Sequence, residues 1–244
     1  MKINIFDRPE PPAKNLSRVG SQTFNVHVKS GWRILGVLEK EINEHYGEIN
    51  SSTKILDFGC GVGRVSIPII QKYNTQLYCT DVDHTAIEFM TTNFGDKCTP
   101  KTNNYLPPLP FEDNFFDIIF SISIWSHLQP EIQIPWLKEM DRIMRENALL
   151  LISTAGFDTL EKHNIEGRFL NVSAEMLHNQ GIAFVKNTGL EKNPNMFPGV
   201  TGDWGVTFLD PEYVQAHWSK VFKLRKIINA AIGKQDLIVM EKYS

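Results

Sequence analysis

Short runs of hydrophobic residues recur along the chain with little polar interruption. They cover residues 54–58, 76–80, 116–121 and 149–153. Runs of this length and composition are typical of β-strands that are buried on both faces, as in a parallel sheet. We therefore expect at least these four segments to lie side by side in one sheet.

The segments between the strands carry hydrophobic residues three or four positions apart, which is the spacing of an amphipathic helix. From Gly31 to Gly47 this pattern is formed by Ile34, Leu35, Leu38 and Ile42. A second helix is expected between an N-cap at Asp83 and Gly95, and a third begins at Pro130. Strands that alternate with helices predict an α/β fold with a doubly wound sheet.

The two ends of the chain and one long interior segment depart from this alternation. Prolines and polar residues without periodicity fill residues 1–30, and residues 156–208 are rich in glycine and aromatic residues with one short predicted helix. We expect a single domain over residues 1–244, divided into an N-terminal arm or lid (1–30), a cofactor-binding core (31–155), a substrate-side insertion (156–208) and a C-terminal helix with closing strands (209–244).

A glycine-rich segment directly follows the first predicted strand. The strand contains Asp57, and glycine then occupies every second position, at Gly59, Gly61 and Gly63. Each glycine removes a Cβ atom where a ligand must come close, and the next helix offers unpaired amide hydrogens there. Dinucleotide-binding enzymes place a glycine one position or three positions later, where this chain has Arg64 and Ser66. The pattern therefore disfavours an NAD(P)-dependent oxidoreductase, which stays an alternative.

This acid-x-G-x-G-x-G turn resembles the first motif of the class I S-adenosylmethionine-dependent methyltransferases. The resemblance implies a Rossmann-like, doubly wound, seven-stranded sheet, mostly parallel with its last strand antiparallel, and helices on both faces. It also implies S-adenosylmethionine as cofactor and S-adenosylhomocysteine as product. In that family the acid, here Asp57, holds the cofactor's ammonium group, whereas the residues alone also allow Asp57 to cap the following helix.

The resemblance implies further contacts with the cofactor. Asp81 would accept the ribose hydroxyls, Val82 would lie against the adenine, and the main chain of Ser121 would face the methionine end. Either Asn103 or Asn104 would meet the adenine amino group, although the pair is also typical of a turn. The expected cofactor-binding residues are thus Asp57, Gly59, Cys60, Gly61, Gly63, Asp81, Val82, Asn103, Asn104 and Ser121.

The reaction implied is transfer of the methyl group to an oxygen or nitrogen of a small-molecule acceptor by in-line displacement. Because a sulfonium is already an activated leaving group, the protein chiefly aligns and desolvates the reactants. His127 is a candidate general base, with a helix-face or capping role as the alternative. Trp125, His163 and Trp204 are candidates for substrate contacts, and no spacing in the sequence matches a metal-binding motif.

The net charge limits the classes of partner that we expect, and the cysteine content indicates the cellular compartment. The net charge of −3 provides no general basic field, so neither nucleic acid nor a membrane is expected to bind. Three cysteines without paired spacing predict reduced thiols and a cytoplasmic protein. A methyltransferase-like protein that binds the cofactor without catalysis, as a scaffold, is the remaining alternative.

Overall fold

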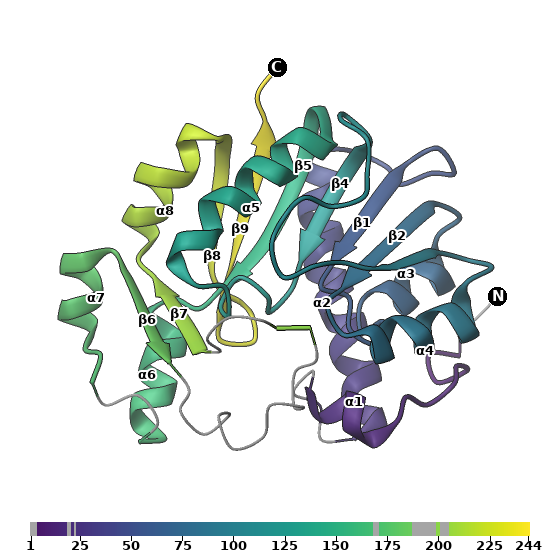
Figure 1. Ribbon diagram of the computed structural model, residues 1–244, viewed down its shortest axis with the longest axis horizontal. Coiled ribbons are helices and arrows are strands. Elements are labelled where there is room, and N and C mark those ends of the chain that lie inside the picture. The colour runs from purple at the N-terminus through teal and green to yellow at the C-terminus, as the bar shows by residue number, and fades with distance from the viewer. Residues whose placement is uncertain (1–3, 19–20, 22, 168–170, 187–198, 201–204) are drawn as a thin grey trace.

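A seven-stranded sheet forms the centre of the computed structural model, which describes residues 4–18, 21, 23–167, 171–186, 199–200 and 205–244 (Figure 1). The strands lie in the order β3-β2-β1-β4-β5-β9-β8. Their bounds are β1 (Lys54–Phe58), β2 (Gln76–Asp81), β3 (Thr99–Thr102), β4 (Phe116–Ser121), β5 (Met144–Thr154), β8 (Phe222–Ile232) and β9 (Gln235–Lys242).

The directions of the strands confirm the predicted sheet. Strands β3, β2, β1, β4 and β5 pair in parallel, and β9 runs antiparallel to both of its neighbours, β5 and β8. The chain winds outward from β1 to β2 and β3, then returns to place β4 on the other side of β1. At such a reversal, the loops after β1 and β4 diverge and leave a crevice at the carboxyl ends of the strands.

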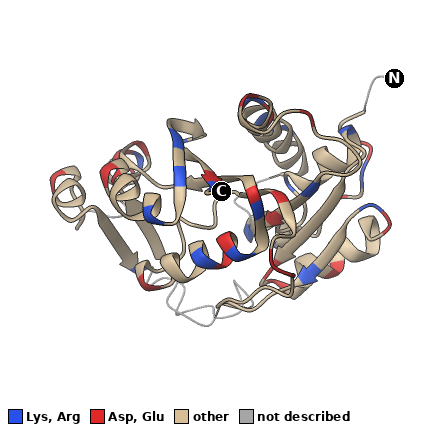
Figure 2. Ribbon diagram, turned by 90° about the horizontal axis from the view of Figure 1, so that it is seen from above, with Lys and Arg blue, Asp and Glu red and all other residues tan. Residues whose placement is uncertain are grey.

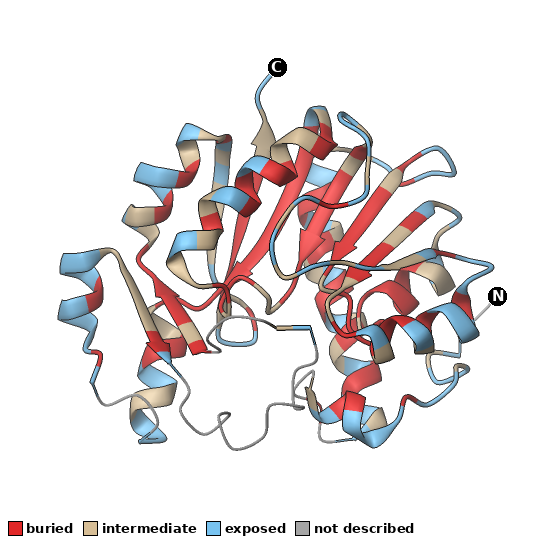
Figure 3. Cartoon of the chain, viewed as in Figure 1, coloured by how far each residue is buried: buried red, intermediate tan, exposed pale blue. Residues whose placement is uncertain are grey.

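Helices cover both faces of the sheet. Side chains of α2 (Phe24–His45), α3 (Ser66–Lys72) and α4 (His84–Phe94) share one buried cluster with Ile118 and Phe120 of β4. The neighbouring residue, Ile119, packs on the opposite face with α5 (Pro130–Ile143), α8 (Pro211–His217) and the 3₁₀ turn η2 (Trp218–Lys220). The central strands are accordingly buried along most of their length (Figure 3). Among the described residues, no helix combines the length and the apolar character needed to cross a bilayer.

Local signals for helix ends are confirmed at several positions. The Asp83 side chain accepts a hydrogen bond from the amide of Thr85, and Gly95 is the C-cap of the same helix. The Asp210 side chain likewise accepts from the amide of Glu212 at the start of α8. Capping depends on residues within one turn of each other, so it can be read from the sequence.

The N-terminal segment contains more helix than its sequence pattern indicates. The helix expected from Gly31 begins instead at Phe24, where the Thr23 side chain accepts from the amide of Val26, and α1 (Ala13–Arg18) precedes it. In the first turns of α2 the buried residues are His27 and Val28, a histidine and a single aliphatic residue, so the hydrophobic period is absent there although the helix is continuous.

The segment 156–208 holds more structure than the one short helix expected. That helix, α7 (Ala174–Gln180), is present with Ser173 as N-cap, but α6 (Phe157–Ile165) and a hairpin of β6 (Ile182–Lys186) and β7 (Gly205–Leu209) were not predicted. These elements share a small core formed by Ala155, Leu160, Val172, Leu177, Val185 and Phe208. The two strands of the hairpin are far apart in sequence, which removes the short-turn signal that identifies hairpins.

Two glycines of α2 provide a matched test of how the helix packs against the loop after β1. A Cβ atom on Gly31 would lie 1.9 Å from the main-chain oxygen of Arg64, whereas one on Gly36 would have nothing within 4 Å. We expect Gly31→Ala to lower the free energy of unfolding by about 1–3 kcal/mol through overpacking. Gly36→Ala should raise it by up to about 1 kcal/mol through helix propensity. Urea unfolding of both variants tests this, and equal effects would contradict the packing described.

Candidate cofactor and acceptor site

A cavity of about 790 Å³ lies where the sheet order reverses, at the carboxyl ends of β1, β2 and β4. This volume is within the range of small-molecule and cofactor sites. Segments that are distant in sequence build its wall: α1, the glycine-rich loop, the ends of β2 and β4, helix α6 and the turn between β8 and β9. The crevice predicted from the fold is therefore present.

The glycine-rich loop is held against the end of β2 by its own backbone. The amides of Gly59 and Cys60 both donate to the main-chain oxygen of Thr80, at 2.8 and 2.9 Å. Gly59, Gly61 and Gly63 have φ values of 81°, 53° and 78°, a region that side chains with a Cβ rarely adopt. Gly59, Cys60 and Gly61 line the cavity.

At position 63, glycine is required for helix packing and not for access to the cavity. A Cβ atom there would lie 2.6 Å from the sulfur of Met90 and 2.8 Å from Ile67, so the absence of a side chain lets α3 and α4 pack. Gly63 is not among the described residues that line the cavity. Its expected place at the cofactor therefore does not match this structure.

Asp57 lines the cavity and is 3% exposed. Its Oδ2 accepts a 2.6 Å hydrogen bond from the hydroxyl of Ser66, the first residue of α3. Burial raises the pKa of Asp57 from 3.8 to about 7, although Ser66 and the Arg64 guanidinium act in the opposite direction. The Asp57 carboxylate thus forms a hydrogen bond to the first residue of α3 and also faces the cavity. The two expected roles, capping of the helix and binding of the cofactor's ammonium group, are therefore compatible.

Asp81 faces the cavity from the end of β2 and also clamps the glycine-rich loop. Its Oδ2 accepts from the amide of Gly61 and its Oδ1 from the amide of Asp83, each at 2.8 Å. Burial raises the pKa of Asp81 to about 6, against the effect of these amides. Each carboxylate oxygen can accept more than one hydrogen bond, so both retain capacity for a ligand hydroxyl.

The two asparagines after β3 are separated by the structure. Asn103 lines the cavity, and its Nδ2 donates to the main-chain oxygen of Asn104 at 2.7 Å. The Oδ1 of Asn103 is buried and has no hydrogen-bond partner among the described residues. Asn104 is exposed and lies outside the described lining. Because a buried acceptor without a donor is costly, the Asn103 oxygen indicates a ligand N–H at this point.

His127 and His163 also line the cavity. The Nδ1 of His127 lies 2.8 Å from the main-chain oxygen of Gly205. A carbonyl oxygen only accepts, so Nδ1 carries the hydrogen and Nε2 is the acceptor of the neutral ring. Burial is the main reason that the pKa of His127 is lowered, which favours this neutral form.

Two further expected site residues, Trp125 and Ser121, are not among the described residues that line the cavity. Trp125 is fully buried, with its ring 5.2 Å from that of Trp218, so it belongs to the core and its expected substrate contact is corrected. The Ser121 hydroxyl donates to the main-chain oxygen of Phe58 at 2.9 Å, and Ser121 is not part of the described lining. Trp204 lies outside the described residues.

Several lining residues were not predicted from the sequence. They are Arg64, Tyr105, Lys162, Lys234 and Gln235, none of which belongs to a recognised motif. The Gln235 Oε1 accepts from the hydroxyls of Ser123 and Ser153, at 3.0 and 2.8 Å. Only the antiparallel pairing of β9 with β5 brings Gln235 to the ends of the parallel strands. Of these residues, only Arg64 could have been suggested from the sequence, because it directly follows the glycine-rich segment.

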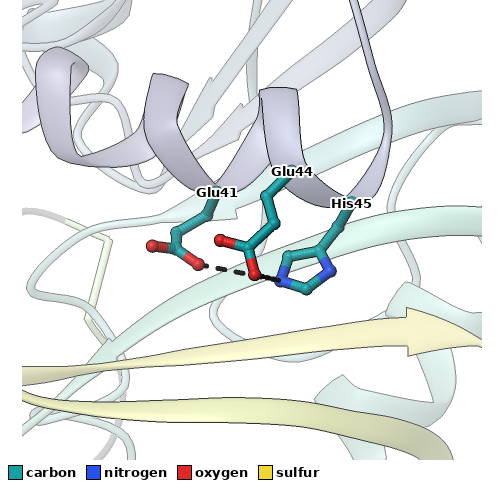
Figure 4. Close-up of side chains that lie close together, drawn as sticks. All are labelled: Glu41, Glu44 and His45. Carbon is teal, nitrogen blue, oxygen red and sulfur yellow. Dashed lines mark ion pairs between the residues drawn. The ribbon is translucent and has the colours of Figure 1, made fainter.

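Two clusters elsewhere have side chains close enough to hold a metal ion, but the structure explains both without one. Figure 4 shows Glu41, Glu44 and His45 on α2. The Lys226 ammonium lies 3.1 Å from a Glu41 oxygen and 3.3 Å from a Glu44 oxygen, so it neutralises these carboxylates. In the second cluster, Asp210 caps α8 and pairs with His178 at 2.9 Å, beside Glu212. We assign no metal to either cluster.

Comparison with known proteins gives relatives at low identity. The chain is 26% identical over 144 residues to tRNA N(3)-cytidine methyltransferase METTL2 of Gallus gallus, which covers 55% of this chain and 39% of that protein. It is 26% identical over 198 residues to an uncharacterized protein of Haemophilus influenzae, covering 78% of this chain and 76% of that one. The chain thus spans 39% of the length of the tRNA methyltransferase that it matches.

These relatives overturn the expected partners. We expected a small-molecule acceptor and, from the net charge of −3, no nucleic acid, yet the tRNA methyltransferases that the chain resembles are named for a nucleoside of tRNA. Net charge sums over the whole surface, on which basic and acidic residues are interspersed (Figure 2). It therefore says little about the charge at one site.

A family model and a solved structure indicate the same kind of protein for the core of the chain. A SAM-dependent methyltransferase of Methanosarcina mazei superposes with a TM-score of 0.58 at 20% identity, covering 83% of this chain and 96% of that one. Residues 55–147, which run from β1 into β5, match the family model of a methyltransferase domain. Residues 55–147 thus match a methyltransferase domain by sequence, and the chain has the fold of solved S-adenosylmethionine-dependent methyltransferases.

Proposed function

We propose that the protein transfers a methyl group from S-adenosylmethionine to a base nitrogen or oxygen of RNA. The observation that carries this proposal is the set of charged groups in one cavity. Asp57 and Asp81 line it near the ends of β1 and β2, together with Arg18 and Arg64, whereas Lys162 of α6 and Lys234 of the β8–β9 turn line it without an acidic neighbour from those strands. A cationic cofactor suits the two acids, which we call the acidic end, and a polyanionic acceptor suits the two lysines, which we call the basic end.

The residues at the acidic end fit the cofactor. Asp57 offers a carboxylate for its ammonium group, and Asp81 offers acceptor positions for the two ribose hydroxyls. Val82 and Asn103 lie beyond Asp81, and the buried Asn103 Oδ1 would accept from the adenine amino group. Arg18 of α1 pairs with Asp83 at 2.5 Å and thereby brings the N-terminal segment over this end.

The basic end favours an anionic acceptor. Lys162, His163 and Lys234 line the cavity there. Lys162 lies 3.9 Å from Glu166 and Lys234 lies 3.7 Å from Asp158, and both lysine side chains are 53% exposed. Such loose, exposed ion pairs contribute little and exchange readily for a phosphate. The similarity to tRNA methyltransferases supports the same acceptor class.

His127 supplies an acceptor for a proton at the reacting end. When bound, S-adenosylmethionine supplies a methyl group on an activated sulfonium. The Nε2 of the neutral His127 ring would then accept the proton of an attacking N–H or O–H group. A ring nitrogen that attacks through its lone pair carries no proton, so for such an acceptor His127 would act by positioning alone.

Methyl transfer itself is tested with the purified protein, methyl-labelled S-adenosylmethionine and total RNA, followed by digestion to nucleosides and mass spectrometry. We expect label in a methylated nucleoside that disappears when the RNA is digested before the reaction. Cofactor binding without label in any RNA fraction would contradict the proposed acceptor and favour a non-catalytic role.

The two asparagines provide a matched pair for the adenine contact. Asn103→Ala removes the buried acceptor and should weaken cofactor binding by about 10-fold, the range for one buried hydrogen bond. Asn104→Ala alters an exposed side chain and should leave the affinity unchanged. Isothermal titration calorimetry measures both, and a loss confined to Asn104→Ala would reverse the assignment.

The raised pKa of Asp57 predicts how cofactor affinity depends on pH. The ammonium group is attracted to the ionised carboxylate, which protonation removes below pH 7. Because the cofactor's amino group stays charged in this range, binding should weaken about 10-fold between pH 7 and pH 5.5. Without cofactor, the folded carboxyl keeps its proton above its ordinary pKa of 3.8, so stability should fall as pH rises from 3.8 to about 7.

Asp57→Asn is the control for this pH dependence. The amide does not titrate but retains an oxygen that can accept from Ser66. The variant should bind the cofactor more weakly at pH 7 and lose most of the pH dependence above pH 6. An unchanged slope would assign the titration to another group, of which Asp81 is the nearest candidate.

The dependence of RNA affinity on salt concentration tests whether the lysines of the cavity contact RNA. Each lysine that contacts a phosphate adds about 1 to the slope of log affinity against log salt concentration. Lys162→Gln and Lys234→Gln should each reduce that slope by about 1 for RNA binding, whereas Lys223→Gln, at the far end of β8, should not change it. Identical slopes in all three variants would mean that the RNA does not contact the lysines of the cavity.

A further inference from the structure

Gln235, the first residue of β9, lines the cavity, yet none of the proposed contacts uses it. The antiparallel pairing of β9 with β5 brings this residue to the carboxyl ends of the parallel strands, where the cavity lies. Its side chain is an amide, so it carries no charge but offers an acceptor oxygen and two N–H donors. A neutral group that both donates and accepts is well suited to the hydrogen-bonding edge of a base.

Three serine hydroxyls hold the side chain of Gln235. The hydroxyls of Ser123 and Ser153 donate to its Oε1, at 3.0 and 2.8 Å. Its Nε2 donates to the hydroxyl of Ser126 at 3.3 Å. Nε2 carries two hydrogens, and within the described part of the chain the second hydrogen has no acceptor. One N–H donor of the carboxamide is thus left for a ligand.

The serines themselves are held in place by burial and by a hydrogen bond between two of them. Ser126 is 2% exposed and Ser153 is 0% exposed. Ser123 has a φ of 64°, which residues with a Cβ rarely adopt, and its amide donates to the hydroxyl of Ser153 at 2.7 Å. Such a conformation persists only where the surroundings impose it. The direction of the remaining N–H is therefore fixed by the protein, which lowers the entropy that binding would cost.

The carboxamide of Gln235 is connected to the glycine-rich loop on one side and to His127 on the other. The hydroxyl of Ser123 lies 3.4 Å from Nη2 of Arg64, which directly follows that loop. Ser126 precedes His127, the proposed proton acceptor, in the chain. Ser123, Gln235 and His127 line the same cavity. A donor in this position would meet the acceptor molecule close to the atom that receives the methyl group.

We propose that Gln235 is a specificity-determining residue for the acceptor, whose remaining N–H donates to a carbonyl oxygen or an unprotonated ring nitrogen of the base that is methylated. This inference rests on the proposed function. A neutral amide suits such a neutral atom, whereas a phosphate is better matched by charged donors such as Lys162 and Lys234. The lysines would hold the RNA backbone, and Gln235 would select the base.

Gln235→Glu tests the proposal, because it replaces the amide by a carboxylate of the same shape. The carboxylate still accepts from Ser123 and Ser153, and the Ser126 hydroxyl can turn to donate to it, so the thermal unfolding midpoint should stay close to that of the wild type. The N–H donor is lost, so kcat/KM for methyl labelling of total RNA should fall about 10-fold, the range for one buried hydrogen bond. The affinity for S-adenosylmethionine, measured by calorimetry, should not fall.

Three comparisons separate the loss of the donor from other effects. Gln76→Glu adds the same charge at the exposed amino end of β2, opposite the cavity, and should leave kcat/KM unchanged. Repulsion between the new carboxylate at position 235 and RNA weakens as salt is added, whereas the loss of a hydrogen bond persists, so the ratio of wild type to Gln235→Glu should stay about 10-fold at high salt. Ser126→Ala removes one support of the carboxamide but keeps its N–H groups, and should lower kcat/KM less than Gln235→Glu does.

Three results would overturn the role of Gln235. If Gln235→Glu and Ser126→Ala lower kcat/KM equally, together with the unfolding midpoint, the hydrogen-bond network only supports the fold. If kcat/KM of Gln235→Glu equals that of the wild type, at all salt concentrations or at high salt alone, the N–H does not contact the base. If the affinity for S-adenosylmethionine falls while KM for RNA is unchanged, the carboxamide contacts the cofactor instead. By contrast, absence of label in RNA with the wild-type protein would refute the proposed function itself, and this inference with it.

Discussion

The attachment of the glycine-rich loop to the end of β2 is the constraint on which the site depends. Two loop amides donate to the Thr80 oxygen, and a third, that of Gly61, donates to the Asp81 carboxylate. These bonds satisfy the backbone of a loop that would otherwise have to pair with water or fold inward. The loop therefore stays open at the reversal of the sheet, where the cavity lies.

That same attachment brings buried acids together. Asp57, one residue before the end of β1, and Asp81, the last residue of β2, come from neighbouring parallel strands and line the same cavity, and desolvation is the largest cause of the raised pKa of each. A ligand that carries positive charge lowers the cost of ionising them. A cationic ligand, as proposed here, would therefore be stabilised by these acids.

The positions of the charged residues around the cavity explain why the net charge of the chain gave a wrong prediction of its partners. Asp57 and Asp81 come from strand ends, whereas Lys162 and Lys234 come from α6 and the β8–β9 turn, elements that are remote in sequence. Positive and negative charges nearly cancel when they are summed over the whole chain. At the cavity, however, the acids and the lysines come from different elements, so their charges do not cancel locally. An acidic protein can therefore present a basic surface where an anionic acceptor would bind.

The sequence by itself determined the strands of the parallel core, the glycine-rich loop, the acids Asp57 and Asp81, and the cap at Asp83. Each depends on residues that are neighbours along the chain, through period, turn or capping chemistry. Tertiary structure alone decided that Asn103 rather than Asn104 lines the cavity, that Trp125 is buried, and that Gln235 and Lys162 reach the site. Those outcomes depend on how distant elements pack, and no local pattern records that packing.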